Sequence, residues 1–294
     1  MTTVEPRELD ELAAAAERTD GFPSLGESDR RDVGSPSAGS LDVVAEREGR
    51  LAAVLHVSAS DSTAHPHRAG GMVMAPDARE PGLATAILER AIAEIGDEAL
   101  IVWFPGSPEH ATKAAAAAGL VHQRDLHRME VALPLAEEPS WPPGVAVRSF
   151  RVGEDEEAWL RVNDRAFAGH PEQSGWSIAT LRRRMEEPWF EPEGFRLAFA
   201  DGSRPDDGAL AGFCWTKRHD PEVGEIFVIG VDPDHQGLGL GRSLVVAGLD
   251  SLAGRGTTTG MLYVDAANVA AVGLYESLGF RVVRTDAAYA RGTP

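Results

Sequence analysis

The sequence predicts an α/β protein made of two related domains in tandem, and three observations lead to this fold class. The chain has 294 residues, which is long for one domain and natural for two of about 150 residues each. Short apolar stretches of strand length alternate with amphipathic stretches of helix length. The segment 133–144 (LPLAEEPSWPPG) holds four prolines and divides two halves with the same order of elements. We expect an N-terminal domain at 1–137, a linker at 138–144 and a C-terminal domain at 145–294.

The first half begins with a helix and continues with a polar stretch, rich in Gly, Ser and Pro, that extends through Ser40. Glu48-Gly49-Arg50 forms the turn between the first two strands. Helices are expected at 8–16, 82–95 and 109–118, and strands at 41–46, 51–58, 70–75, 99–104 and from 120 onward.

The second half repeats this order. Ser177 can cap a helix, because its side-chain oxygen can accept a hydrogen bond from an amide of the first turn. Helices are expected at 155–167, 177–185, 240–252 and 268–278, and strands at 145–148, 195–200, 209–217, 225–231, 260–265 and from 280 onward.

The two halves contain a repeated segment. Residues 76–84 (PDAREPGLA) lie 157 positions before residues 233–241 (PDHQGLGLG), since 233 − 76 = 157. Both segments follow an apolar strand and open a helix. A single repeat of this size indicates duplication of one unit rather than a solenoid.

Composition narrows the function classes. Lys and Arg number 28 against 46 Asp and Glu, so the formal charge of −18 disfavours nucleic acid as a partner. The charge is typical of an adaptation for solubility and can also favour a cationic substrate. No apolar run of roughly 18 residues predicts a membrane span, and the first residues do not look like a secretory signal. The single cysteine, Cys214, is expected in the core, with no disulfide and no metal. We expect a cytoplasmic monomer.

A glycine-rich turn at Gln236-x-x-Gly239-x-Gly241 connects a strand to a helix. Glycines allow a tight turn, and the first amides of a helix have no helical partner, so this arrangement can bind a pyrophosphate. The spacing differs from the dinucleotide-binding Gly-x-Gly-x-x-Gly pattern. Downstream, Asn268, Ala271 and Tyr275 share one helix face, which ends at Gly279.

These two segments resemble the GNAT acetyltransferase superfamily, and the resemblance covers nearly all of 145–290. It implies two GNAT-like domains, each a mixed, mostly antiparallel sheet flanked by helices, with acetyl-CoA as co-substrate. The tandem arrangement, with 170–173 (HPEQ), 215–217 (WTK) and 224–233 (GEIFVIGVDP), looks like the mycothiol synthase family.

That resemblance implies transfer of an acetyl group to the cysteinyl amine of a Cys-glucosaminyl-inositol acceptor, the last step of mycothiol biosynthesis. Two alternatives stay open. One is a tandem GNAT enzyme for another small amine, such as an aminoglycoside, or for a peptide N-terminus. The other is a sensor that binds acyl-CoA without turnover.

The resemblance also assigns roles to individual residues of the second half. Glu225 is expected to take the proton of the amine, and Tyr275 to protonate the leaving thiolate, although the sequence leaves open whether Tyr263 does so instead. The strand is expected to part from its neighbour at Ile229–Val231. The expected substrate contacts are Glu27, Glu172, Lys217, Glu225 and Tyr263. The expected contacts to acetyl-CoA are Ile229, Gly230, Val231, Gln236, Gly237, Leu238, Gly239, Leu240, Gly241, Arg242, Asn268, Val269, Ala270, Ala271, Val272 and Gly273.

The first half lacks the reactive groups. Arg68 stands 157 positions before Glu225, and an offset of 160 maps Asn268 to Pro108 and Tyr275 to Ala115. We therefore hypothesise that this half binds acetyl-CoA without catalysing transfer, although its Glu80-Pro81 pair departs from the family pattern. Its expected contacts are Met72, Val73, Met74, Glu80, Pro81, Gly82, Leu83, Ala84 and Thr85.

Overall fold

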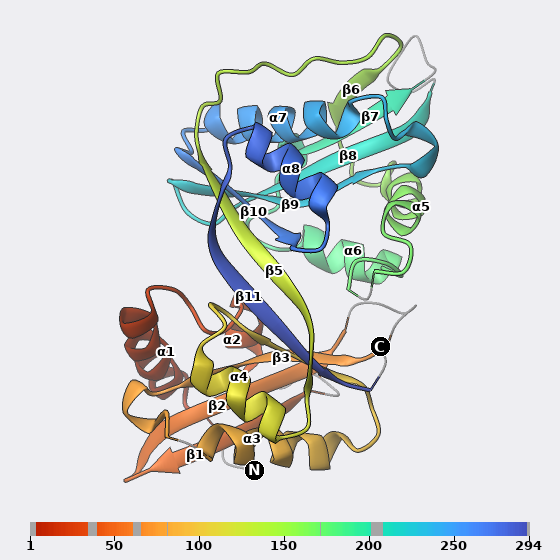
Figure 1. The fold of residues 1–294 in the computed structure, drawn as a ribbon. Helices are drawn as coiled ribbons and strands as arrows, with labels where there is room; N and C mark the ends of the chain where they lie inside the picture. Colours follow the sequence, from red (N-terminus) through yellow and green to blue (C-terminus); the bar gives the residue numbers. More distant parts are fainter. Residues whose placement is uncertain are drawn as a thin grey trace.

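The computed structural model describes residues 4–34, 40–60, 66–80, 82–170, 172–200 and 208–292. Its strands form one mixed sheet of eleven, in the order β1-β2-β3-β4-β11-β5-β10-β9-β8-β7-β6, with helices on both faces (Figure 1). The N-terminal half contains α1 (Pro6–Asp20), α2 (Glu27–Asp32), β1 (Leu41–Arg47), β2 (Arg50–Ala59), β3 (Arg68–Met74), η1 (Pro76–Ala78), α3 (Leu83–Ile95), β4 (Leu100–Phe104), α4 (Glu109–Ala117) and β5 (Val121–Ala132). The C-terminal half contains β6 (Ala146–Ser149), α5 (Glu156–Ala166), α6 (Ile178–Met185), η2 (Pro192–Gly194), β7 (Phe195–Ala200), β8 (Ala209–Arg218), β9 (Val223–Val231), η3 (Pro233–His235), α7 (Leu240–Ala253), β10 (Thr259–Asp265), α8 (Val269–Ser277) and β11 (Arg281–Arg291).

The predicted helices and strands are confirmed within a few residues at each end. Ser177 caps α6 as expected, since its hydroxyl accepts a hydrogen bond from the Thr180 amide at 3.0 Å. Glu48 and Gly49 both have positive φ, which suits the two-residue hairpin turn between β1 and β2. One helix was missed, because the charged segment of α2 (ESDRRD) has no apolar periodicity.

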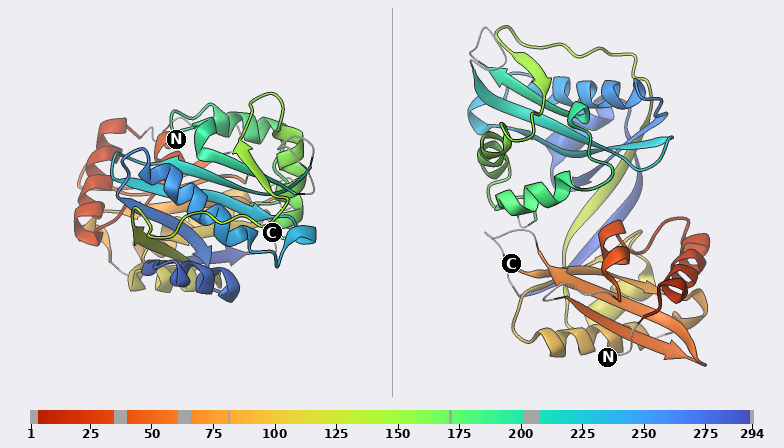
Figure 2. Two further views of the ribbon diagram at one scale, coloured as in Figure 1. Left: turned by 90° about the horizontal axis from the view of Figure 1, so that it is seen from above. Right: turned by 180° about the vertical axis from the view of Figure 1, so that it is seen from behind.

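The last strands of the two halves are exchanged. β5 pairs antiparallel with β10 of the C-terminal half, and β11 pairs antiparallel with both β5 and β4. Figures 1 and 2 show these two long strands side by side, crossing between the two lobes. Residues 133–145 then lead to β6 without a helix or strand. Because strands of the two halves pair with one another, the structure does not divide the chain at 137 and 145. These domain boundaries therefore stay a proposal based on the sequence repeat.

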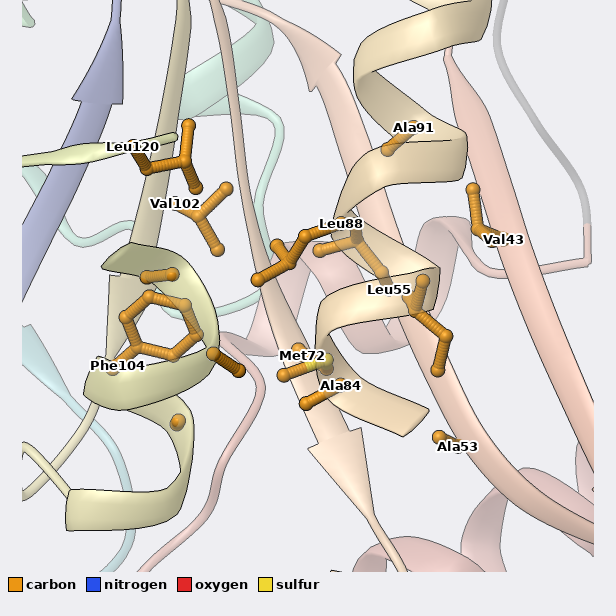
Figure 3. Packing of buried hydrophobic residues seen from close by; sticks show 14 of the residues in the cluster. Val43, Ala53, Leu55, Met72, Ala84, Leu88, Ala91, Val102, Phe104 and Leu120 are labelled. Carbon is orange, nitrogen blue, oxygen red and sulfur yellow. The ribbon is translucent and has the colours of Figure 1, made fainter. Parts of the chain in front are cut away.

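Each half has a core on both faces of its strands. In the N-terminal half, α3 and α4 pack through residues such as Leu88 on Leu55, Val102 and Phe104 (Figure 3), while α1 covers the opposite face. In the C-terminal half, α7 and α8 cover one face, and α5 and α6 enclose an aromatic cluster on the other. The cluster centres on the fully buried Trp159 and Trp215.

Cys214 lies in the core as expected, and burial raises the pKa of its thiol to about 12. Among the described residues, no helix is long and apolar enough to cross a membrane.

Candidate active site

β9 and β10 begin as paired parallel strands and then part. Their register runs from Val223 opposite Thr259 to Ile226 opposite Leu262, although both strands continue beyond it. On its other edge, β9 carries a bulge at Phe227, where the register with β8 shifts. The strands thus part at Phe227, two residues before the expected position, and open the sheet towards α7.

Gly230 lies in a closely packed part of β9. A Cβ atom at this position would lie 2.9 Å from the Phe213 ring and 3.1 Å from Ala166 of α5. Close packing within the protein therefore accounts for this glycine.

The turn before α7 leaves the start of the helix open. Gly237 and Gly239 have φ of 79° and 82°, and a Cβ atom at either would meet nothing within 4 Å, so backbone conformation explains both glycines. Gly239 is the N-cap and provides no side-chain cap, and the first turn holds no acidic residue. A Cβ atom at Gly241 would meet only Leu274 and Val231, at 3.9 and 4.0 Å. Free amides, a positive helix end and open space fit a pyrophosphate.

α8 lies beside this opening. Asn268 caps the helix, its side-chain oxygen accepting from the Ala271 amide at 3.1 Å. Tyr275 is buried in the cluster that contains Ile226 and packs against Phe280. Burial raises the pKa of the Tyr275 hydroxyl to about 12, so the phenol stays protonated at neutral pH.

Arg242, expected at the coenzyme, lies at the surface of the first turn of α7. Its guanidinium forms two hydrogen bonds to Glu137, at 2.6 and 2.8 Å, and one to Ser277 at 2.7 Å. The connection between the halves therefore runs along the mouth of this site.

The face of the sheet opposite α7 and α8 carries three of the expected polar residues. In the β8–β9 register Lys217 lies opposite Glu225, and in the β9–β10 register Glu225 lies beside Met261. Tyr263 follows Met261 by two residues, so its side chain points to the same side of the sheet. The Glu225 carboxylate is buried and lies 2.7 Å from Nε2 of His219.

Tyr263 is the more exposed of the two tyrosines, and its hydroxyl accepts a hydrogen bond from Arg284 at 3.1 Å. Desolvation raises the pKa of Tyr263, although the Arg284 charge opposes this.

The N-terminal half reaches this face through α2. Glu27 forms an ion pair with Lys217 at 2.7 Å, and the Lys217 ammonium also lies 5.0 Å from the centre of the Trp189 ring. The hydrogen bond from Lys217 lowers the pKa of the Glu27 carboxyl. Glu27, Lys217 and Glu225 are thus brought together from three elements.

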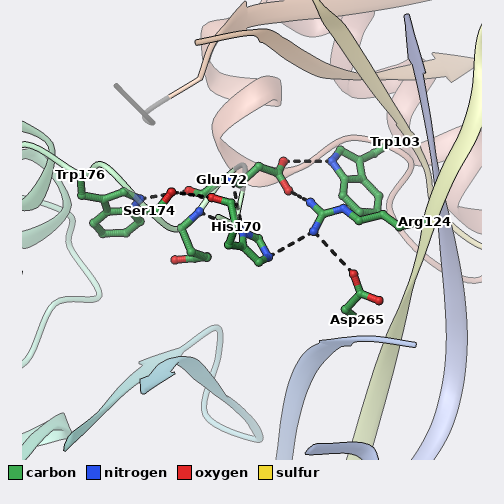
Figure 4. A network of polar contacts seen from close by, with 8 residues as sticks. Trp103, Arg124, His170, Glu172, Ser174, Trp176 and Asp265 are labelled. Atoms are coloured by element: carbon green, nitrogen blue, oxygen red, sulfur yellow. Dashed lines mark hydrogen bonds and ion pairs between the residues drawn. The ribbon is translucent and has the colours of Figure 1, made fainter. Parts of the chain in front are cut away.

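Glu172 belongs to a polar network that joins the two halves (Figure 4). Its carboxylate accepts hydrogen bonds from Arg124 and, at 3.2 Å, from the indole of Trp103. Arg124 also lies 3.1 Å from His170 and 3.8 Å from Asp265. Since Asp265 is two residues beyond Tyr263 on β10, the network borders the same polar face.

Sequence reasoning missed Trp103, Arg124 and His219. Trp103 on β4 and Arg124 on β5 meet Glu172 only where the two halves come together. His219 could have been predicted from the sequence. In the β8–β9 hairpin Lys217 lies opposite Glu225, and His219 follows Lys217 by two residues.

The corresponding opening in the N-terminal half is filled. β3 and β4 part after Gly71 and Trp103 in the same manner. Arg79, however, forks onto Asp20 of α1 with two hydrogen bonds of 2.6 Å and also donates to the Met74 carbonyl.

A cavity of only about 20 Å³ remains in this opening, bordered by Met72, Met74, Phe104 and His110 among others. That volume holds roughly one water molecule, and Arg79 and Asp20 are among the residues that line it. Burial, followed by the charge of Arg79, lowers the pKa of His110. Pro81 lies outside the described residues.

The alignment of the two halves at an offset of 160 residues, which relates Asn268 to Pro108 and Tyr275 to Ala115, agrees with the structure. Pro108 and Asn268 are both N-caps, and the N–H groups of Leu120 and Phe280 both donate to the carbonyl five residues earlier, of Ala115 and Tyr275. The described residues contain no group of three or more His, Cys, Asp or Glu side chains placed to hold a metal ion.

Comparison with known proteins gives consistent matches. The family model "Acetyltransferase (GNAT) family" matches residues 157–280. Proteins named mycothiol acetyltransferase from Thermobispora bispora and Thermomonospora curvata are 41% and 42% identical, over 95% and 96% of this chain and 94% and 92% of theirs.

Among solved structures, a GCN5-related N-acetyltransferase from Sphaerobacter thermophilus has a TM-score of 0.77 at 22% identity, covering 99% of this chain and 95% of that one. A tandem GNAT protein from the clavulanic acid biosynthesis pathway has a TM-score of 0.71 at 17% identity, covering 99% and 96%. Both share the fold of the whole chain.

Proposed function

Because the chain belongs to the mycothiol acetyltransferase family of GNAT enzymes, we propose that it acetylates the cysteinyl amine of a Cys-glucosaminyl-inositol acceptor, the last step of mycothiol biosynthesis. The observation that carries the proposal is the buried carboxylate of Glu225 beside the parted β9 and β10, with the open start of α7 on the same strand pair. A base for the amine and a binding site for the acyl donor thus lie at one opening.

Acetyl-CoA supplies the acyl group as a thioester. We assign its pyrophosphate to the amides of 236–242, where Gly237 and Gly239 set the turn and Gly241 leaves room. The remaining contacts are assigned to 229–231 of β9 and 268–273 at the start of α8. Beyond Phe227, the alternate amides of β9 that point away from β8 lie where β10 no longer pairs, and they can donate to an acyl oxygen, a kind of contact typically worth about 10²–10³-fold in rate.

Proton transfer is assigned to Glu225 and Tyr275. An α-amino group has a reference pKa of roughly 7.7–8.0, so a carboxylate within reach suffices to hold the proton it loses. Tyr275 keeps its phenol proton at neutral pH because burial raises its pKa to about 12, so it has a proton to give to a thiolate. Holding the amine and the thioester together supplies much of the remaining acceleration.

The acceptor is assigned to the polar face that the two halves share. Glu27, Glu172, Lys217 and Tyr263 offer charged and hydroxyl groups, which suit the hydroxyls of a sugar and an inositol. We further propose that the protein works as a monomer in the cytoplasm on small-molecule substrates, without nucleic acid or membrane.

Mass spectrometry of the product tests this function. With acetyl-CoA and a Cys-glucosaminyl-inositol acceptor, we expect one acetyl group on the cysteinyl nitrogen. Acetylation of only another amine would favour a different GNAT substrate, and binding of acetyl-CoA without any acetylated product would favour a sensor. Glu225→Gln should lower kcat by roughly 10²–10⁴-fold while the variant still binds acetyl-CoA.

A further inference from the structure

We propose that His219 is the proton outlet of Glu225: it receives the proton that the carboxylate takes from the amine and passes it to solvent. This inference rests on the proposed function. The need for an outlet follows from the overall reaction, because an ammonium group and a thioester become an amide, a thiol and one free proton. Glu225 must therefore lose one proton to solvent in every turnover before it can act again.

The surroundings of Glu225 give this proton one direct path. The carboxylate is only 10% exposed, and within the described residues its polar partner is Nε2 of His219 at 2.7 Å. The nearby Lys217 is engaged with Glu27 and with the face of Trp189. His219 is therefore the group in contact with Glu225 that can take up its proton and pass it on.

His219 joins this buried carboxylate to water. It follows β8 at the start of the turn to β9, where its backbone N–H donates to the Val223 carbonyl at 3.0 Å, so its main chain is held in place. One third of its side chain is exposed. An imidazole that accepts the proton on Nε2 and releases the one on Nδ1 to water returns Glu225 to a carboxylate, and proton exchange between the ring and water then restores the Nδ1–H form for the next turnover.

If His219 relays a proton, free imidazole can replace it and restore kcat, whereas imidazole would not restore kcat after the loss of a purely structural ion pair. We expect His219→Ala to lower kcat about 10-fold, less than the roughly 10²–10⁴-fold loss of a general base, and to leave the KM for acetyl-CoA unchanged. Imidazole added to the buffer should restore most of kcat in a saturable manner, because the vacated position is partly exposed. Glu225→Gln should show no such rescue.

His219→Gln separates relay from positioning. Glutamine can still donate a hydrogen bond to Glu225, but its amide cannot pass a proton on. We expect this variant to be as slow as His219→Ala. Full activity of His219→Gln, or a loss in His219→Ala that imidazole does not restore, would overturn the proposal.

A control variant and a spectroscopic readout complete the test. His122 forms a similar pair with Asp125, at 2.8 Å, in the N-terminal half, so His122→Ala should keep wild-type kcat and show no response to imidazole. In the ligand-free protein, the ¹⁵N signal of the His219 Nε2 atom should shift in Glu225→Gln, and an unchanged signal would contradict the contact. Turnover by the unaltered enzyme tests the proposed function separately, so its failure is distinguishable from a failure of the relay.

Discussion

The two tyrosines near the parted strands lie on opposite faces of β10. Leu262 and Val264 belong to the cluster that contains Tyr275, so the alternating Tyr263 points to the polar face with Glu225. The sequence left open which tyrosine serves as the acid. Their positions suit Tyr275 to the acyl donor and Tyr263 to the acceptor.

Phenylalanine substitutions therefore have different expected effects. Tyr275→Phe keeps the packing on Phe280 but removes the proton donor, and should lower kcat by about 10²-fold. Tyr263→Phe removes the hydroxyl bound to Arg284 and should mainly raise the KM for the acceptor. Steady-state kinetics with both substrates varied checks this, and the reverse pattern would contradict the assignment.

The N-terminal half holds a buried group of ionisable side chains where the C-terminal half has its aromatic cluster. Asp42 and His56 form a 2.6 Å contact at the positions 157 residues before Phe199 and Phe213 of the aromatic cluster. Burial lowers the pKa of His56, but the Asp42 hydrogen bond and the charges of Asp42 and Asp29 outweigh it, so the pKa rises overall. Burial raises the pKa of Asp29 to about 6.

This group predicts a pH-dependent stability. Both pKa values are higher in the folded chain than in the unfolded one, so the folded state binds more protons. The stabilisation is complete below the unfolded pKa values, roughly 3.9 for Asp and 6.5 for His, and is lost as the pH rises through the folded values. His56→Gln should therefore lower Tm by several degrees at pH 6 and by less at pH 8.5. A gap in Tm that is constant or widens with pH would contradict this.

The starts of α7 and α3 look alike in sequence but differ in what surrounds them. Gly239 and Gly82 both have positive φ and both precede a helix without a side-chain cap. The Gln236 side chain donates weakly, at 3.5 Å, to the Val231 carbonyl, whereas Arg79, 157 positions earlier, pairs with Asp20 and fills the opening. A Cβ atom at Gly82 would also meet nothing within 4 Å, so the two helix starts are alike and the openings beside them differ through the Arg79–Asp20 pair.

Alanine at the two glycines provides a matched pair. Gly239→Ala should cost about 1–2 kcal/mol of stability because a Cβ atom disfavours left-handed backbone, and Gly82→Ala should cost at least as much because its positive φ lies outside the left-handed helical region. Only Gly239→Ala should also raise the KM for acetyl-CoA, because only that turn is assigned to the pyrophosphate. Equal effects of Gly82→Ala and Gly239→Ala on this KM would argue against the assignment.

The Arg79–Asp20 pair in the opening of the N-terminal half also predicts how many acetyl-CoA molecules the chain binds. Isothermal titration calorimetry should give one acetyl-CoA per chain, since Arg79 and Asp20 occupy the opening of the N-terminal half. Two equivalents would show that this ion pair opens for the ligand.

Patterns within short stretches of the sequence predicted most helices and strands. The site contacts that were not predicted join residues far apart in the sequence. The turn at Gln236–Gly241 and the helix from Asn268 to Tyr275 were identified because their chemistry is contiguous in sequence. α2 was missed because it has no apolar face, and Arg124 because a β5 residue meets Glu172 only after strands are exchanged.

The exchange of β5 and β11 makes the two halves one sheet. β5 completes the C-terminal half beside β10, and β11 completes the N-terminal half beside β4. Contacts such as Arg31 with Glu187, at 2.7 and 2.9 Å, add to this connection. Neither half has its full sheet without a strand of the other.

Unfolding should therefore be cooperative over the whole chain. Differential scanning calorimetry should give one transition, with a calorimetric enthalpy close to the van't Hoff enthalpy. Residues 145–294 expressed alone should not fold stably, because β10 loses its β5 partner. Two separate transitions, or a stable isolated C-terminal half, would contradict this.

We propose that the opening between β9 and β10 brings an acyl donor held at the start of α7 to an amine beside Glu225. A crystal structure with bound acetyl-CoA tests it most directly. We expect the pyrophosphate at the amides of 236–242 and the thioester carbonyl between the parted strands, within reach of the Glu225 face. A coenzyme bound only in the N-terminal half, or with its thioester directed away from β9 and β10, would contradict it.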